Sequence, residues 1–112
     1  MLTYKEFRKF IRSLRGLTIE GFGTDSGKGI KDARTRLYKA YGDFLHSLEY
    51  FRSLPKDELQ ALVARGNSHL LKDIVAKAQN TYVREGAFIA AAIQMGLRYE
   101  LSENRPHVIF NL

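Results

Sequence analysis

The sequence contains no cysteine, which excludes a disulfide framework, a cysteine zinc site and a thiol nucleophile. Long apolar runs are missing as well, because no window approaches the roughly 18 uninterrupted apolar residues that a membrane-spanning helix requires. The first residues alternate charged with apolar side chains and show no apolar core of a signal peptide. We therefore expect a cytoplasmic protein.

The chain length fits one domain, because two cores cut from 112 residues would each bury too little apolar surface. Hydrophobic residues make up 45% of the chain and charged residues 27%, as in ordinary globular proteins, which excludes general disorder. We predict a mostly α fold: a single compact domain over residues 1–112, with four to six helices and a small C-terminal β-hairpin.

Positive charge is concentrated in the first third of the chain. Residues 1–40 hold ten bases and four acids and so carry the whole formal net charge of +6, whereas the remainder holds eight of each. Such an asymmetry indicates an anionic partner, nucleic acid first, although a basic face that only keeps the protein soluble is the alternative. The candidate binding residues are the ten bases Lys5, Arg8, Lys9, Arg12, Arg15, Lys28, Lys31, Arg34, Arg36 and Lys39.

The most strongly basic element is a predicted amphipathic helix over residues 3–15. Thr3 and Glu6 form a capping-box signature at its start, and Gly16 can end it. Its bases share one arc next to an apolar arc, a pattern that could follow the phosphate backbone of duplex or structured nucleic acid. The same pattern describes a helix on an anionic membrane, but the apolar stripe has the size of a core-facing one, so we expect no membrane partner.

A glycine-rich connection, residues 16–29, follows this helix, and its five glycines predict either a mobile loop or one whose backbone must adopt unusual angles. Residues 17–19 could form a very short strand within it. It fails as a phosphate-binding P-loop, because Phe22 stands where the first glycine belongs and Gly29 follows Lys28 in place of serine or threonine. We therefore expect no nucleotide hydrolysis and no cofactor. Whether the loop holds any other ligand stays open, with a plain connector as the favoured interpretation.

Residues 30–95 read as a helical core. A stripe of apolar residues predicts a helix over 30–53, with a weak point at Gly42 that marks either a kink or a break into two helices. A further helix is expected over 55–65. A third begins at Asn67 or Ser68 and weakens around residues 79–81.

Residues 87–95 read AFIAAAIQM and are apolar almost all round, which predicts a central helix with Ile89 and Ile93 well buried. Two alternating runs then predict a hairpin over 97–112, with its turn at 102–106. Helix, helix, helix and hairpin is the order of a winged helix-turn-helix. However, so apolar a helix offers almost no polar side chain to base edges, so we do not expect it to read the major groove.

The three histidines, His46, His69 and His107, stand on three separate predicted elements. Acidic residues at helical spacing include Glu49 for His46 and Asp73 for His69, and two ligands make a poor metal site. The sequence accordingly predicts no metal site and no catalytic residue.

The charge distribution and the lack of a catalytic motif together predict a small non-enzymatic accessory or regulatory protein that binds nucleic acid through the ten bases. The alternative is a protein–protein interaction module, an inhibitor or adaptor of the kind that mobile elements encode, whose basic face meets an acidic protein surface. The choice between DNA, RNA and a protein partner stays open. So does the oligomeric state, a homodimer included.

Overall fold

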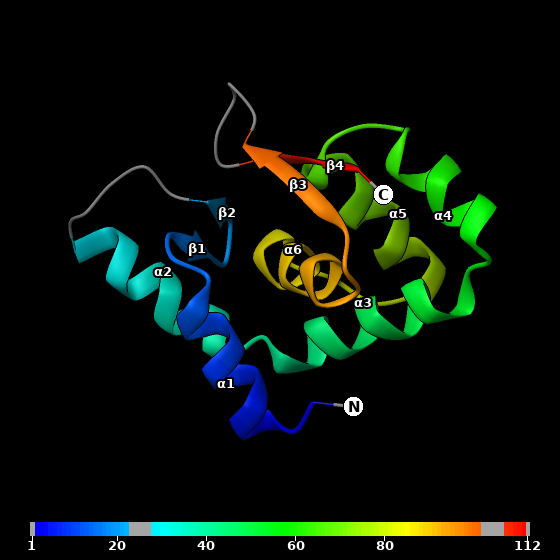
Figure 1. Cartoon of the computed structure of the whole chain (residues 1–112). Coiled ribbons are helices and arrows are strands. Elements are labelled where there is room, and N and C mark those ends of the chain that lie inside the picture. The colour runs from blue at the N-terminus through cyan, green and yellow to red at the C-terminus, as the bar shows by residue number, and fades with distance from the viewer. Residues whose placement is uncertain (1, 23–27, 102–106, 112) are drawn as a thin grey trace.

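A computed structural model describes residues 2–22, 28–101 and 107–111, with the backbone alone at 28–31. Within these ranges the chain forms six helices and four short strands (Figure 1). The prediction of a mostly α chain with a C-terminal hairpin is confirmed. In chain order the elements are α1 (Tyr4–Ser13), β1 (Leu17–Thr18), β2 (Gly21–Phe22), α2 (Lys28–Tyr38), α3 (Tyr41–Ser53), α4 (Lys56–Val63), α5 (Ser68–Gln79), α6 (Glu85–Gln94), β3 (Arg98–Leu101) and β4 (Val108–Asn111).

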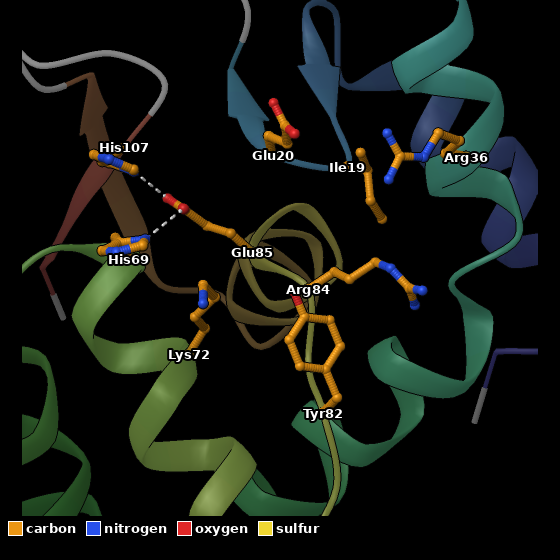
Figure 2. Close-up of a pocket in the computed structure, with 9 residues that line it drawn as sticks. All are labelled: Ile19, Glu20, Arg36, His69, Lys72, Tyr82, Arg84, Glu85 and His107. Atoms are coloured by element: carbon orange, nitrogen blue, oxygen red, sulfur yellow. Dashed lines mark hydrogen bonds and ion pairs between the residues drawn. The ribbon is translucent and has the colours of Figure 1, made fainter.

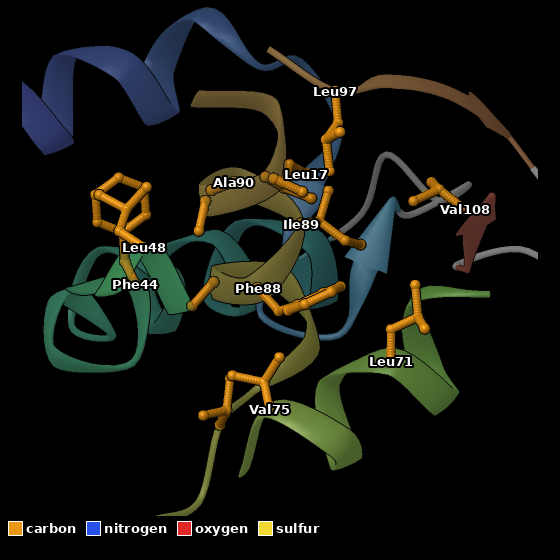
Figure 3. Close-up of a cluster of buried hydrophobic side chains, with 14 of the residues drawn as sticks. Leu17, Phe44, Leu48, Leu71, Val75, Phe88, Ile89, Ala90, Leu97 and Val108 are labelled. Carbon is orange, nitrogen blue, oxygen red and sulfur yellow. The ribbon is translucent and has the colours of Figure 1, made fainter. Parts of the chain in front are cut away.

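Helix α6 lies at the centre of the fold, with α3, α5 and β2 packed against it (Figures 1 and 3). Every residue from Glu85 to Ala92 is buried, as a helix that is apolar on all sides requires. Ile89 is fully buried, as predicted. The same prediction was wrong for Ile93, which is only partly buried because it stands in the last turn of α6, beside the exposed Gln94.

One hydrophobic core holds the chain together. It joins side chains from α1, α3, α5, α6 and the hairpin, several of which are drawn in Figure 3. The Cα radius of gyration is 13.0 Å, which equals the value of about 13 Å expected for a single globule of this length. The predicted single compact domain is thereby confirmed. The largest fully buried side chains are Phe7, Phe44, Phe51 and Phe88.

Helix α1 begins with the predicted capping box. The Thr3 hydroxyl accepts a hydrogen bond from the Glu6 N–H at 3.2 Å, and the Glu6 carboxylate accepts one from the Thr3 N–H at 3.0 Å. The helix ends at Ser13, two residues earlier than predicted, and Gly16 adopts a positive φ of 82° in the turn that follows. Arg15 therefore lies beyond the helix and not on its basic arc.

The first half of the predicted glycine-rich loop is an ordered part of the fold. Strands β1 and β2 pair antiparallel within it, and Leu17, Ile19 and Phe22 are buried. Leu17 and Thr18 form the very short strand that the sequence allowed here, and Gly16 and Gly21 have positive φ values of 82° and 117°, the unusual backbone angles expected of so many glycines. Residues 23–27, which hold further glycines, lie outside the described residues.

The predicted helix over 30–53 is two helices. The break falls after Tyr38, at the buried Ala40, two residues before the expected weak point at Gly42. Asn67 caps α5 by accepting a hydrogen bond from the Leu70 N–H. Asn80, in the left-handed conformation, ends this helix within residues 79–81, where the apolar pattern of the sequence weakens.

Strands β3 and β4 form the predicted antiparallel hairpin, in a register that pairs Arg98 with Asn111 and Leu101 with Val108. The predicted turn at 102–106 lies outside the described residues. Strand β4 buries Val108 and Phe110 and contacts α4 and α5. The helix and hairpin order of the C-terminal half is as predicted, but residues 85–92 of α6 are all buried and present no free face to a nucleic-acid groove. No helix in the described ranges is long and apolar enough to cross a membrane.

Candidate functional site

The outer side of α1 carries four exposed cations, which we call the α1 cation row: Lys5, Arg8, Lys9 and Arg12. The inner side of the same helix is held in the core by Phe7 and Ile11, both fully buried. The row borders a surface hollow of about 560 Å³, together with Tyr4 and Glu6. Among the described residues, no ion pair involves a member of the row, so its charge is free to meet a partner.

Arg8 is the best-positioned member of the row. Its guanidinium lies 5.9 Å from the ring centroid of Tyr4 and 5.5 Å from that of Tyr38, so two cation–π contacts orient it. The acid beside the row, Glu6, is turned to the helix start. The hydrogen bonds from the Thr3 backbone and side chain lower the pKa of Glu6 below its ordinary value of 4.5.

Arg34, another of the predicted binding residues, is turned inward from α2. Its guanidinium donates hydrogen bonds to the carbonyl oxygens of Leu14 at 2.9 Å, Leu17 at 3.0 Å and Ile11 at 3.1 Å. These carbonyls lie at and beyond the C-terminal end of α1, where backbone acceptors lack helical partners. The side chain thus joins α2 to the end of α1, and we leave it out of the binding surface.

The remaining predicted bases do not extend the row as a group. Arg15 and Lys39 are exposed in the turns after α1 and α2. Arg36 lines a different hollow, described next. The side chains of Lys28 and Lys31 lie outside the described part of the chain.

A second hollow, of about 350 Å³, lies where the first turns of α5 and α6 meet the residue that precedes β4 (Figure 2). We call it the Glu85 pocket, after the buried carboxylate in its wall. Charged and imidazole side chains dominate its lining. The lining residues are Ile19, Glu20, Arg36, His69, Lys72, Tyr82, Arg84, Glu85 and His107.

Glu85 is only 5% exposed, and its carboxylate is surrounded by polar groups from α5 and from the start of the hairpin. Oε2 accepts a hydrogen bond from the Ser68 hydroxyl at 2.6 Å and lies 2.7 Å from His107 Nδ1. Oε1 lies 3.4 Å from His69 Nδ1. The Ser68 oxygen in turn accepts the Val108 N–H at 3.0 Å, so the carboxylate links α5, α6 and the hairpin.

The close packing of the first turn of α6 places Glu85. The N–H of Gly86 donates to the Ile19 carbonyl at 2.9 Å, and a Cβ at Gly86 would stand 1.9 Å from the Thr18 carbonyl oxygen. Only glycine allows this approach. A carboxylate in the first turn of a helix is also favoured by the helix dipole, and burial of its charge requires the donors that surround it.

Two of the cations in the pocket wall have carboxylate partners. Lys72 Nζ lies 2.9 Å from Asp73 Oδ1, and this hydrogen bond lowers the pKa of Asp73 below its ordinary 3.8. Arg84 donates to Asp43 through its backbone N–H at 3.0 Å and its guanidinium at 3.2 Å. The net charge of the pocket wall and its partners is therefore closer to zero than the number of bases in the wall indicates.

Sequence reasoning missed the cluster in this pocket. It treated the histidines as isolated, whereas the fold brings His69 and His107 together with Glu85, with one ligand atom of each within 4.8 Å of the others. His46 is exposed on α3 and takes no part. One available signal was Glu85 itself, an acid that closely precedes the apolar run of residues 87–93.

Two imidazoles and a carboxylate can bind a transition-metal ion or exchange protons, and a row of exposed cations can bind phosphates. No family model, no curated protein sequence and no solved structure matches the chain. The geometry of these two sites is therefore the basis for inferring a function.

Proposed function

We propose that this chain is a small non-enzymatic accessory or regulatory protein that binds duplex or structured nucleic acid through the α1 cation row. The observation that carries the proposal is the row itself, four exposed cations on one side of a helix whose other side is buried. Positions 5, 8, 9 and 12 span about 10 Å along the helix axis. One DNA strand presents roughly three phosphates over that length.

The surroundings of the row favour phosphate contacts over stacking with bases. The Tyr4 ring packs against Tyr41 at a centroid distance of 5.5 Å and also contacts the Arg8 guanidinium. Tyr4 is 45% exposed, but stacking on a base would compete with these contacts, whereas a duplex needs only the cations. Because Arg8 is already oriented, less side-chain entropy is lost when it meets a phosphate.

The test removes three members of the row and leaves Arg8, whose contacts with Tyr4 and Tyr38 also support packing. The variant is Lys5→Ala, Lys9→Ala, Arg12→Ala. The matched control, Lys56→Ala, Arg65→Ala, Lys77→Ala, removes the same charges from exposed positions in the nearly neutral part of the chain. Fluorescence anisotropy with labelled duplex DNA and hairpin RNA is measured from about 50 to 200 mM salt.

We expect the wild type to bind both probes with a steep salt dependence. Removal of three phosphate contacts lowers the slope of log affinity against log salt by about three, and the control leaves it nearly unchanged. Equal losses in the variant and the control contradict a localised interface. A wild type that binds neither probe at low salt overturns the proposal and favours the alternative, in which the row meets an acidic protein surface.

A further inference from the structure

We propose that the Glu85 pocket binds a divalent transition-metal ion of the zinc class through His69, Glu85 and His107. Two imidazoles and one carboxylate form a donor set that suits zinc and its neighbours in the first transition row. The three residues come from α5, α6 and the start of the hairpin, and one ligand atom of each lies within 4.8 Å of the other two.

The distance between His69 and Glu85 fits two ligands of one ion better than it fits a hydrogen bond. His69 Nδ1 lies 3.4 Å from Glu85 Oε1, beyond the usual hydrogen-bond range. Tetrahedral bonds of about 2.0–2.1 Å place two ligand atoms about 3.3 Å apart. His107, now 2.7 Å from Oε2, exchanges its hydrogen bond for a bond to the ion.

A hydrogen bond from a neighbouring side chain orients the carboxylate of Glu85, as is usual for carboxylates that bind metals. The fully buried Ser68 donates to Glu85 Oε2 at 2.6 Å and accepts from the Val108 N–H at 3.0 Å. This arrangement can keep Oε2 occupied while Oε1 faces His69. Ser68 is thus a positioning residue of the proposed site.

The charge of the pocket also permits a cation. Lys72 and Arg84 are paired with Asp73 and Asp43, and Glu85 contributes an acid to the wall. Because the three residues line a hollow of about 350 Å³, water could complete the coordination of an ion held by them.

The test titrates metal-free protein with Zn²⁺ by isothermal calorimetry and follows thermal unfolding with Zn²⁺ or with a chelator. The main variant is His69→Ala, which should fold normally because the side chain is 58% exposed. Its matched control is His46→Ala, which removes the exposed histidine outside the cluster. Mg²⁺ serves as the control ion, since it prefers oxygen ligands in octahedral geometry.

We expect one Zn²⁺ per chain, a higher melting temperature with Zn²⁺ than with chelator, and no effect of Mg²⁺. The His69→Ala variant should lose at least tenfold in Zn²⁺ affinity, and His46→Ala should bind as the wild type does. A wild type that binds no Zn²⁺ overturns the proposal and leaves the cluster as a hydrogen-bonded link between elements. Equal losses in both variants, or none in His69→Ala, would show adventitious binding and overturn it as well.

This proposal does not depend on the proposed nucleic-acid binding, because the two sites use different residues. The nucleic-acid titration performed in chelator tests the α1 cation row alone. The Zn²⁺ titration without nucleic acid tests the Glu85 pocket alone.

Discussion

Gly86 packs against Thr18 so closely that a Cβ at position 86 would stand 1.9 Å from the Thr18 carbonyl oxygen. This contact packs the start of α6 against the strand pair β1 and β2. It also fixes the position of Glu85, the preceding residue, in the wall of the Glu85 pocket. One glycine without a side chain therefore supports both the core and the candidate metal site.

The first prediction concerns this glycine. Gly86→Ala forces the first turn of α6 away from Thr18 and should destabilise the fold by about 1–3 kcal/mol or more. Gly42→Ala is the matched control, because a Cβ there meets nothing within 4 Å, and it should raise stability by up to about 1 kcal/mol. Urea denaturation followed by circular dichroism measures both. A Gly86→Ala protein as stable as the wild type would refute the close packing.

The second prediction concerns the hydrogen bonds of Arg34 to the end of α1. A lysine ammonium cannot reproduce the planar fork that serves three carbonyls, so Arg34→Lys should cost about 1–3 kcal/mol of unfolding free energy. Arg36→Lys, two residues along α2 at an exposed position, should change stability by less than about 0.5 kcal/mol. Equal effects of the two substitutions in chemical denaturation would contradict the assigned role of Arg34.

The third prediction separates the two isoleucines of α6. Ile89 is fully buried, so Ile89→Ala should cost about 2–5 kcal/mol of unfolding free energy. Ile93 is only partly buried, so Ile93→Ala should cost clearly less, because part of its side chain already meets water. Equilibrium denaturation of the two variants in parallel measures both free energies of unfolding. A larger loss for Ile93→Ala than for Ile89→Ala would contradict the burial of these two side chains in α6.

The fourth prediction is a pH dependence at the start of α1. Hydrogen bonds from Thr3 lower the pKa of Glu6 below 4.5 in the folded state, so ionised Glu6 stabilises the fold above that pH. The stabilisation is lost as the pH falls through the lowered value. The difference in melting temperature between the wild type and Glu6→Ala should therefore be steady near neutral pH and shrink in acid. A difference that does not change with pH would contradict the capping role of the carboxylate.

Several features of the fold could be predicted from the sequence because residues close in the chain determine them. Thr3 and Glu6 are three positions apart, and their capping box forms within one helical turn. The continuous apolar run after Gly86 has no polar side to expose, so its helix must be central. The alternation of the last residues likewise predicts a hairpin, because successive side chains of a strand point to opposite faces.

What only the tertiary structure decided is which distant residues meet. Arg34 bonds to a carbonyl 23 positions away, and Ser68 joins Glu85, 17 positions on, to Val108, 40 positions on. The periodic spacing of apolar residues in the sequence does not predict such contacts. They depend on how the helices pack around α6 and not on the residues within one turn. The charge that marks the α1 cation row was thus visible in the sequence, whereas the Glu85 pocket appeared only when two helix ends and a strand were brought together by the core.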